Sequence, residues 1–112
     1  MDCQFSEVSG VTKAVLEGRM DSSSIGLVET KFIANIVPKE QPAVVDLTGV
    51  TFIASLGIRM LLSTGRALGQ RGAKLAMYGA QEQVMEIIET TALSEIIPVV
   101  ATEDEALAAV TS

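Results

Sequence analysis

The stretch VVDLTGVTFIASLGIRMLL, residues 44–62, predicts a buried strand, a short loop and a helix in immediate succession. The strand is expected at 43–47, where Pro42 precedes a run rich in β-branched residues. The loop is expected at 48–51. The helix is expected from about Ser55 to Gln70, with Arg71-Gly72 ending it. A strand that leads directly into a helix indicates an α/β fold.

The segments on either side continue this alternation. Apolar periodicity and turn residues predict strands at 3–9, 11–17, 73–79 and 96–100, and helices at 25–37, 82–93 and 102–110. Ser22–Ser24 are expected to cap the first helix and Pro38 to stop it. The order β-β-α-β-α-β-α-β-α predicts one α/β domain over residues 1–112. Its mixed sheet has four to five strands, mostly parallel with an antiparallel N-terminal strand, packed with four helices.

The amino-acid composition argues against several classes of function. The 112 residues are 48% hydrophobic and carry a formal charge of −6, which argues against direct nucleic-acid binding. There is no His, and Cys3 is the single cysteine, so the sequence predicts no catalytic triad, no metal site and no cofactor. Neither a signal peptide nor an apolar run near 20 residues is visible, so we expect a cytoplasmic protein without membrane insertion.

Ser55 at the mouth of the central helix has two interpretations. It is an ordinary N-cap, or it is an exposed hydroxyl that accepts a phosphate, which a helix N-terminus would tolerate. Arg59 lies one turn further along and could pair with that phosphate. The spacing places a polar and basic set on one helix face, Ser55, Arg59, Ser63, Arg66 and Gln70, opposite an apolar set of Ile58, Leu61, Leu62 and Leu68.

Two carboxylates and four methionines need separate interpretations. Asp21 is expected to be a cap or turn residue, and Asp46 to be hydrogen-bonded or at a strand end. Nothing in the sequence places them together as an acid–base pair. Met20, Met60, Met77 and Met85 are expected to fill the core, and Met60 is the best candidate among them for a contact surface.

Three short motifs resemble the STAS domain of the anti-sigma-factor antagonist type. Residues 18–21, GRMD, resemble the family's G-x-[LI]-D turn before its first helix. Residues 44–50, VVDLTGV, resemble its central strand and loop. Residues 52–58, FIASLGI, resemble its F-[IM]-D-S-[ST]-G-L signature. The expected order of elements matches the family fold along essentially the whole chain.

The resemblance implies a switch protein rather than an enzyme. Members bind an anti-sigma factor that is also a serine kinase, which frees a sigma factor; the kinase phosphorylates the serine that matches Ser55, and a metal-dependent serine phosphatase reverses this. A phosphate in a tight interface would break the complex through repulsion and desolvation. The residues expected to bind the partner are Asp21, Ala54, Ser55, Leu56, Gly57, Arg59, Met60, Ser63 and Arg66.

The chain departs from the signature at two positions, because Ala54 replaces its Asp and Leu56 replaces its Ser or Thr. Ser55 could then be phosphorylated, be a poor substrate, or belong to a constitutive binder. One alternative is therefore a non-switching STAS module, such as a signalling-scaffold or transporter accessory subunit. A more remote alternative is weak nucleotide binding through Arg59 and Arg66. The exposed edge of the first strand also allows a weak homodimer.

Overall fold

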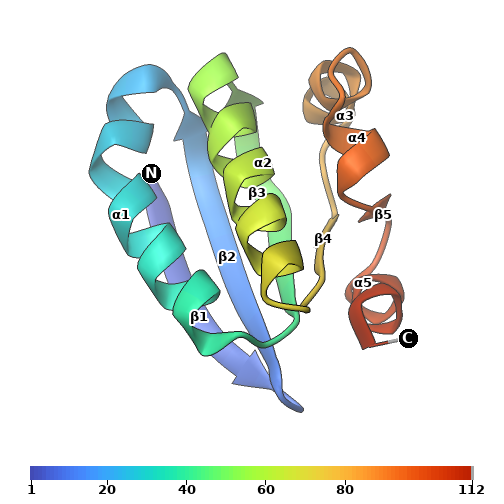
Figure 1. Ribbon diagram of the computed structural model, residues 1–112. Helices are drawn as coiled ribbons and strands as arrows, with labels where there is room; N and C mark the ends of the chain where they lie inside the picture. The colour runs from blue at the N-terminus through green and yellow to red at the C-terminus, as the bar shows by residue number, and fades with distance from the viewer. Residues whose placement is uncertain (112) are drawn as a thin grey trace.

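A computed structural model describes residues 1–111 of the chain. Figure 1 shows its helices and strands. In chain order they are β1 (Asp2–Val8), β2 (Val11–Met20), α1 (Ser22–Ile36), the 3₁₀ turn η1 (Val37–Lys39), β3 (Ala43–Ile53), α2 (Ser55–Gln70), β4 (Leu75–Tyr78), α3 (Glu82–Glu89), α4 (Leu93–Ile96), β5 (Val99–Val100) and α5 (Glu103–Thr111).

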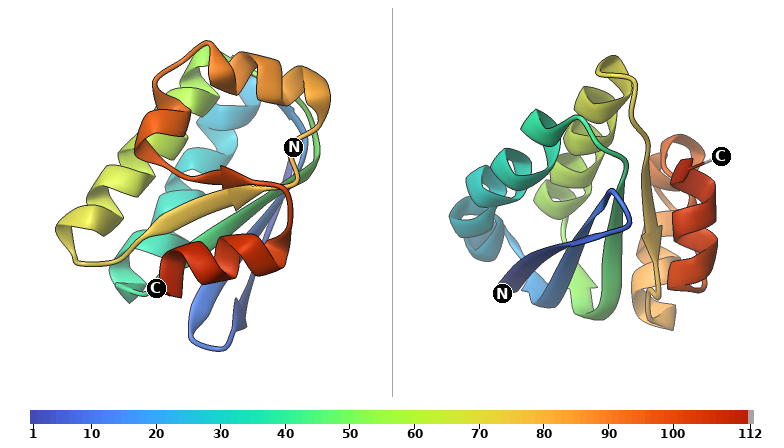
Figure 2. Two further views of the ribbon diagram at one scale, coloured as in Figure 1. Left: turned by 90° about the vertical axis from the view of Figure 1, so that its right-hand side faces the viewer. Right: turned by 90° about the horizontal axis from the view of Figure 1, so that it is seen from below.

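The five strands form one sheet in the order β1-β2-β3-β4-β5. β1 pairs antiparallel with β2, and the remaining neighbours pair in parallel. The predicted α/β class, mixed sheet and antiparallel N-terminal strand are therefore confirmed. Buried residues of α1, α2 and α3 share one core on one face of the sheet, while α5 packs on the other face. Figure 2 shows α5 and α2 on opposite sides of β4.

The described residues contain five α-helices where the sequence predicted four. The expected helix at 82–93 is interrupted after Glu89, where two threonine hydroxyls donate hydrogen bonds to carbonyl groups in the last turn of α3. Thr90 Oγ1 donates to Ile87 O and Thr91 Oγ1 to Ile88 O, each at 2.8 Å. Thr91 Oγ1 then accepts from the Leu93 amide at 3.2 Å, where α4 begins.

The strand boundaries differ most from the prediction in β2, β3 and β5. β2 runs to Met20, whereas the prediction ended this strand at Glu17. β3 continues through the expected loop at 48–51 and ends at Ile53, because β2 is long enough to pair with it to Met20. The pairing includes two register shifts, one between Val15 and Glu17 and one between Gly18 and Arg19, and at each of them β3 contributes one more residue than β2. β5 has only two residues rather than five, since Ile96 belongs to α4.

Two separate apolar clusters hold the layers together. The larger one fills the space between the sheet and α1 to α3, with Phe32, Met60 and Met77 fully buried. The smaller one lies under α5 and contains Val11, Val44, Ala76, Tyr78, Ala106 and Val110. An ion pair of 2.9 Å between Lys13 Nζ and Glu103 Oε1 adds a link between β2 and α5.

The parallel pairing places the starts of α1 and α2 side by side. Met20 and Ile53, the last residues of β2 and β3, are register partners. The Ala54 amide then donates to Met20 O at 2.8 Å. The two helices leave the same edge of the sheet as immediate neighbours, so the segments at 18–21 and 52–58 meet there (Figure 1).

Candidate functional site

Helix α1 begins at a carboxylate cap. Asp21 has an extended backbone, with φ −94° and ψ 174°, and its Oδ1 accepts a hydrogen bond from the Ser24 amide at 2.9 Å. The hydroxyls of Ser24 and Ser23 donate to the same oxygen at 2.8 and 3.1 Å. These hydrogen bonds, led by that of the Ser24 amide, lower the pKa of Asp21 below its ordinary value.

The prediction that Asp21 is a cap or turn residue is thus confirmed. The prediction that Ser22–Ser24 cap α1 is wrong, because these serines are the first residues of the helix itself. Two of them donate to the cap rather than act as it. Arg19 adds a weaker contact, with Nε 3.8 Å from Asp21 Oδ2.

Helix α2 begins without a side-chain cap. Ala54 occupies the N-cap position with φ −93° and ψ 171°, almost the backbone of Asp21, but its methyl group cannot accept a hydrogen bond. Ser55 is the first helical residue, and its exposed hydroxyl makes no hydrogen bond within residues 1–111. The interpretation of Ser55 as the N-cap is wrong, because the cap position lies one residue earlier.

The polar face predicted for α2 is confirmed. Ser55, Arg59, Ser63, Arg66 and Gln70 are all exposed. Within residues 1–111, neither Arg59 nor Arg66 forms an ion pair, whereas Arg71 pairs with Glu40 at 3.8 Å. The opposite face is in the core, with Leu61 and Leu68 fully buried. The helix therefore presents uncompensated positive charge beside Ser55.

Two residues expected to contact a partner lie inside the protein. Met60 has no exposed surface and belongs to the main core, so the prediction that it forms a contact surface is wrong. Gly57 is also buried, and a Cβ there would lie 3.1 Å from Ile53 Cγ1 and 3.2 Å from Met20 Cε. Both residues lie on the buried side of α2, which faces the core. Leu56, by contrast, is 39% exposed beside Ser55.

The carboxylate of Asp46 lies apart from that of Asp21. Asp46 Oδ1 accepts from the Thr48 amide at 2.9 Å, which confirms the expected hydrogen bond. In the sheet Asp46 pairs with Val15, well before the strand end where Asp21 lies, and with Tyr78 on the other side. Burial is the main cause that raises the pKa of Tyr78, and Asp46 adds to it. The structure does not bring the two aspartates together.

A groove runs beside Ser55 between the start of α2 and the end of α3. It has a volume of about 610 Å³ and is lined by Phe52, Ile53, Ala54, Ser55, Ile58, Ile87, Thr90 and Thr91. We refer to these eight residues as the α2–α3 groove. The guanidinium carbon of Arg19 lies 4.6 Å from the centre of the Phe52 ring, a cation–π contact at the same edge.

The sequence did not reveal the α3 side of this groove. Ile87, Thr90 and Thr91 are more than thirty positions from Ser55, and only the packing of α3 against the sheet brings them near it. The apolar character of Phe52 and Ile58 was visible, but it equally describes core residues. Arg19 and Phe52 gave a local signal, since both fall within the motif segments at 18–21 and 52–58.

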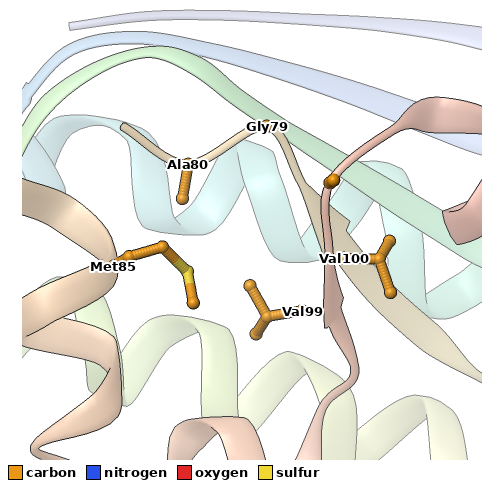
Figure 3. A pocket seen from close by; sticks show the side chains of 6 residues that line it. Gly79, Ala80, Met85, Val99 and Val100 are labelled. Atoms are coloured by element: carbon orange, nitrogen blue, oxygen red, sulfur yellow. The ribbon is translucent and has the colours of Figure 1, made fainter. Parts of the chain in front are cut away.

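A second pocket, of about 400 Å³, lies where β4 and β5 end. Gly79, Ala80, Met85, Val99, Val100 and Ala101 line it. In Figure 3 Met85 and Val99 point toward one another, while Val100 points the opposite way. Val99 and Met85 pack against the main core and Val100 against the smaller one. This pocket has no charged or hydroxyl side chain to support chemistry.

No group of three or more Cys, Asp or Glu side chains within residues 1–111 is placed to hold a metal ion. No helix in the same range has both the length and the apolar character required to cross a bilayer.

Comparison with known proteins gives consistent results. The STAS domain model matches residues 4–106. The chain is 27% identical over 109 residues to BtrV of Bordetella bronchiseptica, a proposed anti-sigma factor antagonist, covering 97% of this chain and 94% of BtrV. The crystal structure of an anti-sigma factor antagonist from Mycobacterium paratuberculosis is 26% identical, with a TM-score of 0.88 over 99% of this chain and 94% of that one.

The fold also matches SpoIIAA, a Bacillus cell fate determinant, in its phosphorylated form. The TM-score is 0.70 at 17% identity, over 96% of this chain and 98% of that one.

Proposed function

The chain belongs to the STAS domain family, and we propose that it acts as an anti-sigma-factor antagonist. In this role it binds an anti-sigma factor that is also a serine kinase, and a sigma factor is released. The observation that carries the proposal is the structure of the start of α2. This helix has no side-chain cap, the Ser55 hydroxyl is exposed, and Arg59 lies one turn away without an ion pair in the described residues. The names of two similar proteins, from Bordetella bronchiseptica and Mycobacterium paratuberculosis, support the same role.

Ser55 is the proposed phosphate acceptor. Its hydroxyl is free of hydrogen bonds in the described part of the chain, so a kinase need not break one. A phosphate there would add a charge of about −1.5 to −2. The positive end of the α2 dipole and Arg59, one turn away, would stabilise that charge within the free protein.

The same charge would oppose a bound partner. Ser55 lies beside exposed Leu56, so a partner that covers this region would have to desolvate the phosphate. Phosphorylation is thus expected to favour the released state. We also propose that a metal-dependent serine phosphatase restores the unmodified form, that residues 1–112 act as one domain, and that the protein works in the cytoplasm.

The proposed binding surface surrounds the two neighbouring helix starts. It comprises the sequence-predicted residues that are at least partly exposed, namely Asp21, Ala54, Ser55, Leu56, Arg59, Ser63 and Arg66. Gly57 and Met60 act indirectly, because they hold the start of α2 in place from the core. A weak homodimer through the free edge of β1 stays a prediction.

A second candidate function is a non-switching STAS interaction module. The feature that favours it is the pair of apolar residues on either side of Ser55, since Ala54 and Leu56 leave no polar residue directly before or after Ser55 in the sequence for a kinase to recognise. Such a module would use the same surface in a signalling scaffold or with a transporter, with Ser55 unmodified.

Affinity capture from the source cells distinguishes the two functions. The baits are the unmodified chain, Ser55→Ala and Ser55→Asp, with mass spectrometry of the retained proteins. We expect the first two to retain a serine-kinase-like anti-sigma factor and the third to lose it. Equal retention on all three would contradict the switch and favour the non-switching module. Recovery of a transporter or scaffold instead would contradict the antagonist function.

A further inference from the structure

The α2–α3 groove has a chemical character that the motif residues alone do not define. Phe52, Ile58 and Ile87 supply apolar walls, and Ala54 adds a methyl group. The hydroxyls of Thr90 and Thr91 already donate to Ile87 O and Ile88 O. A groove of about 610 Å³ with such walls accommodates a bulky apolar side chain better than a polar one.

Charge is distributed unequally along the two sides of this groove. On the α2 side, Arg59 is exposed and forms no ion pair within residues 1–111. The whole segment 47–81 contains four basic residues and no acidic one. On the α3 side, exposed Glu86 and Glu89 flank the lining residue Ile87. A partner carboxylate is therefore attracted toward α2 and repelled from α3.

Ala54 determines whether such a carboxylate can approach. An acidic residue at the N-cap position would place negative charge within the groove and next to Ser55. It would repel a partner carboxylate and occupy the start of α2 itself. With alanine at this position, the groove is lined by no charged side chain, and Arg59 is the nearest charged residue along α2.

From these observations we infer the chemistry of the partner segment. A bulky apolar side chain of the partner fills the α2–α3 groove, and a carboxylate beside it pairs with Arg59. A phosphate on Ser55 competes with that carboxylate for Arg59, because residues four apart on a helix are neighbours. The partner is thus released because its carboxylate loses the ion pair with Arg59 and because the phosphate repels that carboxylate. Only the identity of the partner rests on the proposed function.

Model peptides test the inference without the partner. The probe is a blocked tetrapeptide of leucine, phenylalanine and two glutamates, titrated into the ¹⁵N-labelled full chain and followed by amide chemical shifts. Matched peptides carry two glutamines in place of the glutamates, or two glycines in place of the apolar pair. An ionic strength of about 0.15 M limits electrostatic effects to about 8 Å. The chain's net charge of −6 disfavours the acidic probe overall, so a preference for it must be local.

We expect the leucine–phenylalanine–glutamate probe to shift the amides of Ala54, Ser55, Ile58, Ile87 and Thr91. It should bind about two- to fivefold more tightly than the glutamine peptide, the range for one exposed ion pair. The glycine peptide should not bind. Arg59→Gln should remove the preference for glutamate, while Arg71→Gln, an equal charge change at the far end of α2, should preserve it. Ser55→Asp should weaken binding of the glutamate peptide only.

Three results would overturn the inference: equal binding of the glutamate and glutamine peptides, shifts outside the groove, or a preference that survives Arg59→Gln. None of these depends on a kinase. If the peptide preference is absent while cells still yield an anti-sigma factor on the Ser55→Ala bait, the inference is wrong and the proposed function stands. The opposite pattern would retain the groove chemistry and refute the antagonist function.

Discussion

Helices α1 and α2 start side by side with nearly the same backbone, yet their first turns are built differently. The N-cap of α1 is Asp21, whose carboxylate accepts three hydrogen bonds from Ser23 and Ser24. The N-cap of α2 is Ala54, which accepts none through its side chain. The start of α1 is satisfied by its own sequence, whereas the start of α2 is held by packing and remains open to another molecule.

This difference in capping affects which serine hydroxyls at the two helix starts are available for modification. The hydroxyls of Ser23 and Ser24 are engaged with Asp21, so a kinase would have to break local hydrogen bonds to reach them. The hydroxyl of Ser55 has no such partner in the described residues. Ser23 and Ser24 are thus weaker candidates for modification than Ser55, and the Asp21 cap accounts for that difference. Ser22 matches Ser55 in position, and its exposed hydroxyl makes no hydrogen bond within residues 1–111, but Gly26 lies four residues along α1 where α2 has Arg59.

The largest change in stability is expected at Gly57, because packing around this residue, rather than a side-chain cap, holds the start of α2. Gly57→Leu should destabilise the protein by about 1–3 kcal/mol, because the added side chain must displace Ile53 and Met20. Gly26→Leu in α1 is the matched control, since nothing lies within 4 Å of a Cβ at that position. Urea unfolding of both variants measures the effect. Equal stability of the two would contradict the role of packing at the start of α2.

A smaller effect of opposite sign is expected from a cap added to α2. Ala54→Asp should stabilise the protein by about 0.5–2 kcal/mol, because the new carboxylate can accept from amides of the first turn. Ala54→Asn provides the same type of cap without the charge. Thermal unfolding at neutral pH measures the gain. Loss of stability in both variants would mean that the start of α2 is already satisfied.

The smallest effect concerns the pH dependence of the existing cap. The pKa of Asp21 is lowered in the folded state, so its contribution to stability is present above the unfolded-state pKa and is lost as pH falls through the folded-state pKa. Unfolded aspartate titrates near pH 3.9. The stability difference between the parent chain and Asp21→Asn should therefore shrink between about pH 5 and pH 2. Chemical denaturation across this range checks the sign, and a difference that grows in acid would contradict it.

The fold was largely predictable because it follows from periodicity. Alternating strands and helices from residue 42 onward indicated parallel pairing, and Gly10 marked the N-terminal hairpin. Helix starts were less predictable. The cap depends on the backbone angles of one residue, and a run such as Asp21 to Ser24 offers four candidate side chains for it.

The α2–α3 groove was predictable only on its α2 side. Helical spacing alone predicted the exposed face that carries Ser55 and Arg59. Spacing could not show that Met60 is entirely covered, because that depends on how α2 lies on its neighbours. The α3 wall of the groove required the tertiary fold, since Ile87 and Thr91 are distant in sequence.

The phosphorylation state of Ser55 in the source cells shows whether the open start of α2 is a site of modification. Trypsin releases residues 40–59 as one peptide in which Ser55 is the only serine, while Ser22–Ser24 fall in a different peptide. Mass spectrometry of the protein recovered from growing cells should find phosphate at Ser55 and none at the serines of α1. An unmodified Ser55 under every growth condition, or phosphate on Ser22–Ser24 instead, would contradict the account.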